Sequence, residues 1–208
     1  MSTACKICIN SKEEDVCLSM SIYLKNEDDE YLEESSEWPL AIEYSEFNPD
    51  ESMPSLLSIK QVTEDVTEIH YNSFSKVVDL VSYLSKNLKT KAVVNIYQST
   101  AEACYWAYYL DGEQLREIET GDGEILDDNG IKLDFENDQL GHNISDTGEE
   151  PFYIFDTEDM EHYNNSVGIN AEIYQKYDSN WKNFKMKFIL DELNKKIAAT
   201  SKAWWKFW

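Results

Sequence analysis

Apolar and polar residues alternate in two segments near the start of the chain. In the first segment Ile7 and Ile9 are apolar, and in the second every other residue from 16 to 22 is apolar. The polar stretch 11–15 separates the two segments. A period of two is typical of a strand with one buried face, because successive side chains point to opposite sides. The pattern therefore predicts a β-hairpin over residues 1–24.

The pattern changes to helical spacing in the region 74–89, where apolar residues recur three and four positions apart after the cap candidates Ser73 and Ser75. This spacing predicts a helix. Residues 92–98, 104–110 and 113–119 are rich in β-branched or aromatic residues, or alternate, and predict strands. The pair Asp111-Gly112 between the last two segments is a strong signal for a tight hairpin turn.

The second half of the chain contains two further strand-like segments and one helical segment. Strands are predicted at 131–135 and 152–155, separated by turn-forming stretches at 121–130 and 137–150. Apolar residues at helical intervals predict one or two helices over 170–203. The expected fold is a single α+β domain over residues 1–208. It has an antiparallel sheet, one central helix at about 74–89, and C-terminal helices packed on the sheet.

The charge of the chain is strongly negative and unevenly distributed. Asp and Glu supply 41 of the 208 residues and Lys and Arg supply 18, which gives a formal net charge of −23. Residues 1–170 contain 37 acidic and 10 basic residues, whereas residues 171–208 contain 4 and 8. The aromatic content of 13% distinguishes this chain from acidic disordered sequences. Such a surface repels nucleic acid and anionic membranes and attracts basic proteins over about 8–10 Å at physiological salt.

The basic, aromatic segment 170–208 has two alternative roles. Lys on one side and Trp and Phe on the other fit a membrane-surface helix, but the acidic body opposes binding to an anionic leaflet. Packing on the sheet is therefore favoured, with no stable insertion in a membrane. The final cluster 204–208 contains three Trp residues, which either complete the core or form a contact surface.

The segment 25–54 combines many carboxylates with aromatic residues. Aromatic side chains among carboxylates need a core or a partner to cover them. We therefore expect this segment, together with the acidic turn near residue 127, to bind a basic protein. The candidate partner-binding residues are Glu30, Tyr31, Glu33, Glu34, Trp38, Tyr44, Phe47, Asp127 and Asp128. Replacing Glu33 and Glu34 with Lys is expected to slow association and weaken its salt dependence.

No catalytic residue, metal site or cofactor site is predicted. Cys5 and Cys8 have the spacing of half a zinc site, but no second pair of ligands completes it, so ordinary reduced strand cysteines are expected. The acidic turn 122–129 lacks the register of a calcium-binding EF-hand loop. Nucleophile, phosphate-loop, dinucleotide and metalloprotease motifs are absent. With a single arginine, Arg116, direct binding of nucleic acid is not expected.

The location and origin of the protein are inferred from composition. The chain has no run of 18 apolar residues and no basic leader before an apolar segment. A soluble, cytoplasmic protein is therefore expected. Lys outnumbers Arg 17 to 1, a bias often produced by an AT-rich genome, so a bacterial or bacteriophage origin is expected.

The segment 92–118 contains the run Cys104-Tyr105-Trp106-Ala107-Tyr108-Tyr109-Leu110, followed by Asp111-Gly112-Glu113 and Leu115-Arg116-Glu117. It resembles hairpins of small acidic bacterial immunity proteins that act against polymorphic toxins. The resemblance implies a protein without enzyme activity that neutralises one toxin domain by covering its active site. It assigns no functional residue.

Three hypotheses follow. The first is an inhibitor or immunity protein whose acidic face covers the active or binding site of a basic, nucleic-acid-processing partner. The second is a phage-type DNA mimic that blocks a nuclease or another DNA-binding protein. The third is a hydrolase that uses carboxylates or a metal, which requires a concave site with perturbed carboxyl groups. The aromatic residues among the carboxylates favour the first hypothesis, because a phosphate mimic has less need of apolar anchors.

Overall fold

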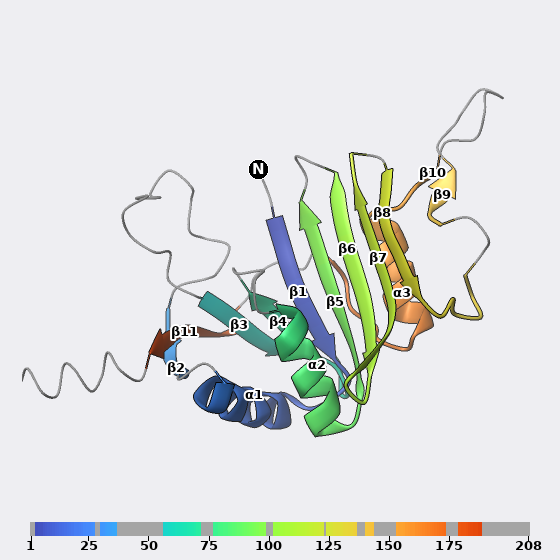
Figure 1. Cartoon of the computed structure of the whole chain (residues 1–208). Helices are drawn as coiled ribbons and strands as arrows, with labels where there is room; N and C mark the ends of the chain where they lie inside the picture. The colour runs from blue at the N-terminus through green and yellow to red at the C-terminus, as the bar shows by residue number, and fades with distance from the viewer. Residues whose placement is uncertain are drawn as a thin grey trace, which may run out of the picture.

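The molecule is built around a nine-stranded antiparallel sheet whose strands run in the order β2-β11-β3-β4-β1-β5-β6-β7-β8 (Figure 1). This computed structural model describes residues 3–27, 30–36, 56–71, 77–98, 102–122, 124–136, 140–143, 153–173 and 179–188. In chain order its elements are β1 (Thr3–Ile9), α1 (Glu13–Glu27), β2 (Glu30–Ser35), β3 (Leu56–Gln61), β4 (Thr67–Tyr71), α2 (Val77–Leu88), β5 (Lys91–Gln98), β6 (Ala103–Leu110), β7 (Glu113–Gly121), β8 (Glu124–Gly130), β9 (His142–Asn143), β10 (Tyr153–Ile154), α3 (Thr157–Ser166) and β11 (Lys182–Phe188). The short strands β9 and β10 pair separately. The predicted α+β class and antiparallel sheet are confirmed.

Helices cover both faces of the large sheet. On one face, α1 and α2 pack against alternate residues of the central strands, among them Ile7, Ile69 and Val94. On the other face, α3 packs through Met160 and Tyr163. We call these the α1/α2 face and the α3 face. In Figure 1, α1 and α2 lie in front of the sheet and α3 lies behind it.

The central helix and the hairpin after it form as their sequences predict. Helix α2 buries Val77, Leu80, Val81 and Leu84, one stripe at helical spacing. Strands β5, β6 and β7 pair consecutively. The two-residue turn between β6 and β7 has positive φ at Asp111 (+52°) and Gly112 (+89°), the conformation that an Asp-Gly hairpin turn requires.

The second half of the predicted N-terminal hairpin is wrong, because residues 13–27 form helix α1. Their apolar residues also satisfy helical spacing: Val16, Met20 and Leu24 recur every four positions and are buried. Leu18 and Ile22, which completed the strand-like alternation, are 64% and 42% exposed. Three acidic residues in the first turn and a lysine in the last complement the helix dipole.

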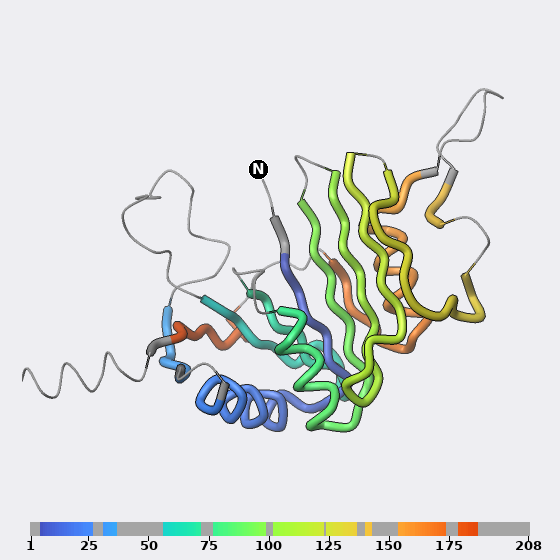
Figure 2. Tube along the Cα trace, viewed as in Figure 1, coloured from blue at the N-terminus to red at the C-terminus, as the bar shows by residue number. Residues whose placement is uncertain are grey.

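The helix predicted over 170–203 is wrong at 182–188, where the chain forms strand β11 between β2 and β3. Alternate residues Phe184 and Met186 pack on the core of the α1/α2 face, so the period of two dominates over the helical one. In Figure 2, β11 and β2 run side by side at one end of the sheet. The remainder of the predicted helical segment beyond residue 188, including the Trp cluster at 204–208, lies outside the described residues.

Two other boundaries differ from the prediction. Strand β8 occupies 124–130, where turns were predicted, and residues 131–136 form no strand. In that segment Leu133 and Phe135 pack on the core of the α3 face instead. Helix α3 was not predicted. Its signal is the capping box of Asp156 and Asp159, each side chain of which accepts a hydrogen bond from the other residue's backbone N–H.

Candidate functional site

The structure separates the predicted partner-binding residues into two groups at opposite edges of the sheet. Glu30, Tyr31, Glu33 and Glu34 lie on the edge strand β2, whereas the pair at 127–128 lies on the edge strand β8. The two strands lie at opposite ends of the sheet in Figure 2. The remaining candidates, Trp38, Tyr44 and Phe47, lie outside the described residues. The described candidates therefore do not form one continuous surface.

The β2 group is itself divided between the two faces. Glu33 lies on the α3 face, directly opposite Lys185 of β11, and this arrangement of unlike charges on neighbouring strands is favourable. Glu34 lies on the other face, opposite Phe184. A partner approaching one face of β2 therefore meets at most one of these two carboxylates, and Glu33 already has a lysine beside it.

The two aspartates of β8 also differ. Asp128 lies on the α3 face, where its Oδ1 is 2.5 Å from Nη2 of Arg116. The Arg116 side chain is buried and donates three hydrogen bonds to Glu136: from Nε to Oε1 at 2.9 Å and to Oε2 at 3.1 Å, and from Nη2 to Oε2 at 2.9 Å. Asp127 points to the α1/α2 face and is exposed. Only Asp127 of this pair is thus available to a partner as an uncompensated charge.

Asp127 belongs to a surface that the sequence pattern does not predict. One cross-strand row on the α1/α2 face runs from Ile96 in β5 through Tyr105 and Glu119 to Asp127 in β8. In the next row, Glu117 of β7 faces Asn129 of β8. We call the following residues the acidic face: Ile96, Tyr105, Glu117, Glu119, Asp127 and Asn129.

The described residues leave part of the acidic face uncovered. Helix α2 covers the lower ends of β5 and β6, and no described helix lies in front of their upper ends or of β8 (Figure 1). No Lys or Arg of β5–β8 lies on this face: Lys91 and Arg116 both point to the α3 face, where Lys91 binds the carbonyl of Val167 and Arg116 binds Glu136. The face is therefore negative, without a compensating cation from its own four strands.

Hydrogen bonds fix part of this face. The Tyr105 hydroxyl donates to Oε1 of Glu117 at 2.8 Å, and the Asn129 amide donates to Oε2 of Glu117 and to Oδ1 of Asp127, both at 3.4 Å. Burial raises the pKa of Tyr105, and the hydrogen bond to the Glu117 carboxylate raises it further. Tyr105 therefore remains a protonated donor that orients Glu117.

Glu119 differs from its neighbours. No hydrogen bond or ion pair to its carboxylate occurs within the described residues, and Glu119 stands directly opposite Asp127. Like charges directly opposite each other on adjacent strands are destabilising. The pair of carboxylates thus costs the free protein stability, and a cation placed between them would remove that cost.

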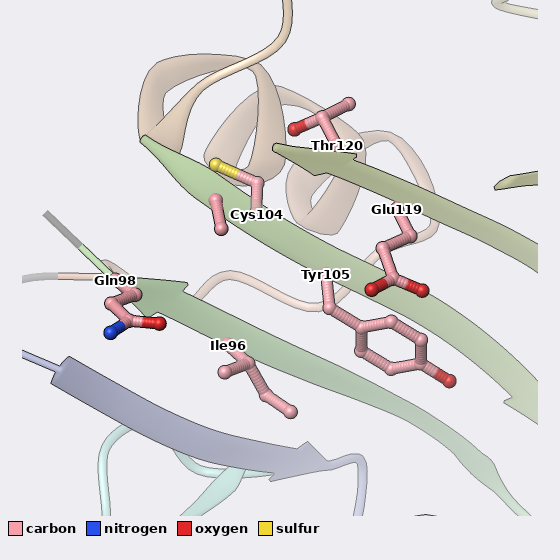
Figure 3. A pocket seen from close by; sticks show the side chains of 7 residues that line it. Ile96, Gln98, Cys104, Tyr105, Glu119 and Thr120 are labelled. Carbon is pink, nitrogen blue, oxygen red and sulfur yellow. The ribbon is translucent and has the colours of Figure 1, made fainter. Parts of the chain in front are cut away.

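A pocket of about 250 Å³ opens beside Glu119. Its lining residues are Ile96, Gln98, Ala103, Cys104, Tyr105, Glu119 and Thr120. Figure 3 shows Ile96, Tyr105 and Glu119 coming from three neighbouring strands, with the carboxylate of Glu119 beside the Tyr105 side chain. The pocket combines apolar walls with one carboxylate and one amide.

A second cluster of charged groups lies in the middle of the sheet on the α3 face. Nζ of Lys6 is 3.2 Å from Oε2 of Glu68, and Nε2 of His70 is 3.7 Å from the same oxygen. The ring of Trp181 packs edge-on against His70 at 4.6 Å between centroids, and Lys6 donates a hydrogen bond to the carbonyl of Glu172. The side chains of the charged triad are at most 4% exposed. A substrate could reach these side chains only if the residues that pack on them, among them Glu172 and Trp181, moved.

This buried cluster helps to define the register of the sheet. Lys6 pairs directly with His70 on β4 and with Asn95 on β5, so one polar row crosses the buried face. A slip of one residue would turn these polar side chains to the apolar α1/α2 face. The cluster therefore helps to fix the strand register, and this structural role requires no catalytic function.

The histidine of this cluster makes stability depend on pH. Burial lowers the pKa of His70; the nearby Glu68 opposes this shift, and the ammonium groups of Lys6 and Lys60 add to it. His70 therefore binds a proton near pH 6.5 in the unfolded chain but only at lower pH in the folded protein. As the pH falls below about 6.5, the free energy of unfolding decreases. We expect H70N to weaken the loss of stability between about pH 7 and pH 5, measured by urea unfolding.

A matched variant at His142 should change the pH dependence of stability in the opposite direction. The hydrogen bond to Asp159 raises the pKa of the exposed His142, so its stabilising contribution is complete below pH 6.5 and is lost as the pH rises. H142N should consequently make stability fall more steeply on acidification. Equal pH slopes for the wild type and H70N would contradict the account of His70.

The potential metal ligands do not form a convincing site. Cys5 and Cys8 lie on opposite faces of the sheet, in separate core clusters, so they cannot share one ion. Within the described residues, the acids of 122–129 form no metal-binding group, and the one such group joins His142, Asp156 and Asp159. Both aspartates of that group are occupied by the capping box of α3, which explains their positions.

Three of the four cysteines, Cys5, Cys8 and Cys104, are buried, and Cys17 is partly buried. All four are free, and burial raises the pKa of the Cys5 thiol and raises that of Cys104 to about 12. A thiol with a raised pKa is a poor nucleophile and metal ligand at neutral pH. The predicted placement of Cys5 and Cys8 in a strand is confirmed.

Comparison with protein-family models, with curated proteins and with solved structures finds no match to this chain. Among the helices of the described residues, none combines the length and the apolar character needed to cross a membrane.

Proposed function

We propose that this chain is a non-enzymatic inhibitor or immunity protein of the cytoplasm, which binds one basic, nucleic-acid-processing protein and covers its active or binding site. The observation that carries the proposal is the acidic face. It presents Glu117, Glu119 and Asp127 on one surface without a cation from the strands that form it. Opposite charge on a partner would steer association and fix the orientation of the complex.

Apolar groups around the acidic face favour a protein partner. Ile96 and Tyr105 are only partly buried within the face, and Ile125 and Leu126 of the edge strand β8 are 48% and 58% exposed. Interfaces obtain most of their binding energy from such apolar and aromatic contacts, with charges arranged around them. A DNA mimic needs the carboxylates but not these anchors.

We place the proposed interface at the β8 edge of the sheet rather than at the β2 edge. Asp127 remains in the candidate site, whereas Asp128 is used by Arg116 and Glu33 faces Lys185. The enzymatic alternative draws little support from the buried Lys6 cluster, since its side chains are covered. Replacing Glu33 and Glu34 with Lys therefore becomes a control rather than a disruptive change.

The test compares two variants that change the net charge equally. We expect tagged wild-type protein to capture one stoichiometric basic partner from a lysate of the source organism, with capture weakened by salt. E119K/D127K should lower the association rate at low salt by on the order of 10-fold or more, whereas E33K/E34K should remain close to the wild type. Circular dichroism checks that both variants fold.

Three results would count against the proposal: no partner captured at low or at high salt, loss of capture by E33K/E34K alone, or equal capture by both variants. Competition by duplex DNA for the captured partner tests the second hypothesis. If DNA displaces the chain and single apolar substitutions such as I96A leave binding unchanged, the DNA-mimic interpretation is favoured.

A further inference from the structure

The pocket beside Glu119 indicates which kind of chemical group the acidic face binds. Its walls are formed by Ile96, Ala103 and the Tyr105 side chain, and Glu119 and Gln98 supply its polar groups. We propose that this pocket receives one cationic side chain with an aliphatic stem, an arginine or lysine of the basic partner. The inference rests on the proposed function, because the partner supplies the occupant.

The residues that line the pocket suit such a side chain. Arg and Lys bury their methylene stems against apolar surface while their charged ends contact polar groups. Here Ile96 and Ala103 offer the apolar surface, and the carboxylate of Glu119 lies beside the Tyr105 side chain (Figure 3). An arginine guanidinium could pair with the carboxylate and stack on the aromatic ring, which are both favourable interactions.

The state of Glu119 is the second observation. Glu117 and Asp127 already accept hydrogen bonds from Tyr105 or Asn129, whereas no donor reaches Glu119 within the described residues. Glu119 also faces the like charge of Asp127 directly across β7 and β8. A cationic side chain in the pocket satisfies the Glu119 carboxylate and relieves this repulsion.

This arrangement predicts opposite effects of one substitution on stability and on binding. E119Q removes the repulsion from Asp127 while keeping the shape of the side chain, so its urea midpoint should rise slightly above that of the wild type. The same variant should lose affinity for the cationic ligand. A residue with a purely structural role would not give this combination.

The binding experiment uses small probes and the full chain, so it needs no identified partner. Nitrogen-15 NMR spectra are recorded during titration with N-acetyl-arginine methylamide, the corresponding lysine derivative, and the citrulline derivative, which has nearly the shape of arginine without its charge. We expect saturable shift changes at the amides of residues 96, 103–105 and 119 with the arginine or lysine probe. The citrulline probe should bind at least 10-fold more weakly.

Two variants separate the pocket from general surface charge. E119Q removes the carboxylate, and A103L fills the pocket while leaving every charge in place; both should abolish the saturable shifts. E33Q serves as the control and should bind the arginine probe like the wild type. Non-saturating shifts spread over all acidic residues, equal binding of citrulline, or unchanged binding by A103L would overturn the pocket assignment.

The outcomes for the pocket and for the proposed function can be told apart. If a basic partner binds the acidic face but the probes do not enter the pocket, only the pocket assignment fails. If the probes bind and no partner is captured, the pocket assignment stands as a site for a cationic side chain while the inhibitor proposal fails.

Discussion

Replacing Glu68 with glutamine is expected to lower the free energy of unfolding by about 3–5 kcal/mol, the cost of removing one partner from a buried ion pair. Glu68 is fully buried and lies 3.2 Å from the ammonium group of Lys6. Without that carboxylate, the Lys6 charge remains in the middle of the sheet, with the carbonyl of Glu172 as its acceptor. Urea unfolding monitored by circular dichroism measures the change.

The control for this prediction is E64Q, which makes the same chemical change at an exposed loop position. It should alter stability by less than about 0.5 kcal/mol. The double variant K6M/E68L replaces the whole pair by apolar side chains and should recover most of the loss. A loss for E68Q no greater than that for E64Q would show that the Lys6–Glu68 pair is not desolvated as described.

The second large effect is expected at Arg116, the single arginine of the chain. Its guanidinium binds both carboxylate oxygens of Glu136, contacts Asp128, and donates to the carbonyl of Asn129 at 2.8 Å. R116M leaves the buried Glu136 carboxylate without its cation, so we expect a loss of about 3–5 kcal/mol in urea unfolding. R116K should be intermediate, because an ammonium group cannot reproduce the bidentate geometry.

R116M also separates the effect of net charge on partner binding from the effect of the structure of the acidic face. R116M makes the chain more negative, which by charge alone should speed association with a basic partner. It also removes the bonds that hold β8, and with it Asp127, in place. We expect weaker binding. K12M removes an exposed lysine and is the matched control for charge; a loss of stability for R116M no larger than for K12M would contradict the role given to Arg116.

Elements defined by local signals could be predicted from the sequence. Helix α2 has one continuous apolar stripe, and strands β6 and β7 are joined by an Asp-Gly turn whose geometry those two residues impose. Both features depend on residues close together in the chain. The prediction failed where one segment satisfied two periods, as in α1, where apolar residues fit a spacing of two and also a spacing of four.

The pairing of distant strands could not be read from the sequence. Strand β11 inserts between β2 and β3, and this position selects its period of two over the helical alternative. The same long-range topology places β2 and β8 at opposite edges, which divides the predicted binding residues. Nothing in the local composition of either strand indicates the distance between them.

Part of the acidic face did have a local signal. In β7, Glu117 and Glu119 alternate with the buried Arg116 and Ile118, which places both glutamates on one side of the strand. The alternation in this segment predicts a hairpin strand but does not by itself indicate a binding surface. The alignment of Glu119 with Asp127 depends on the register shift between Glu119 and Thr120, which only the structure reveals.

The most direct test of the central claim is hydrogen–deuterium exchange of the full chain with and without its captured basic partner. Binding through the acidic face should slow exchange in β6, β7 and β8, residues 103–110, 113–121 and 124–130, and leave residues 30–36 and 182–188 unchanged. Protection confined to β2 and β11, with β6–β8 unchanged, would contradict the account and return the interface to the opposite edge of the sheet.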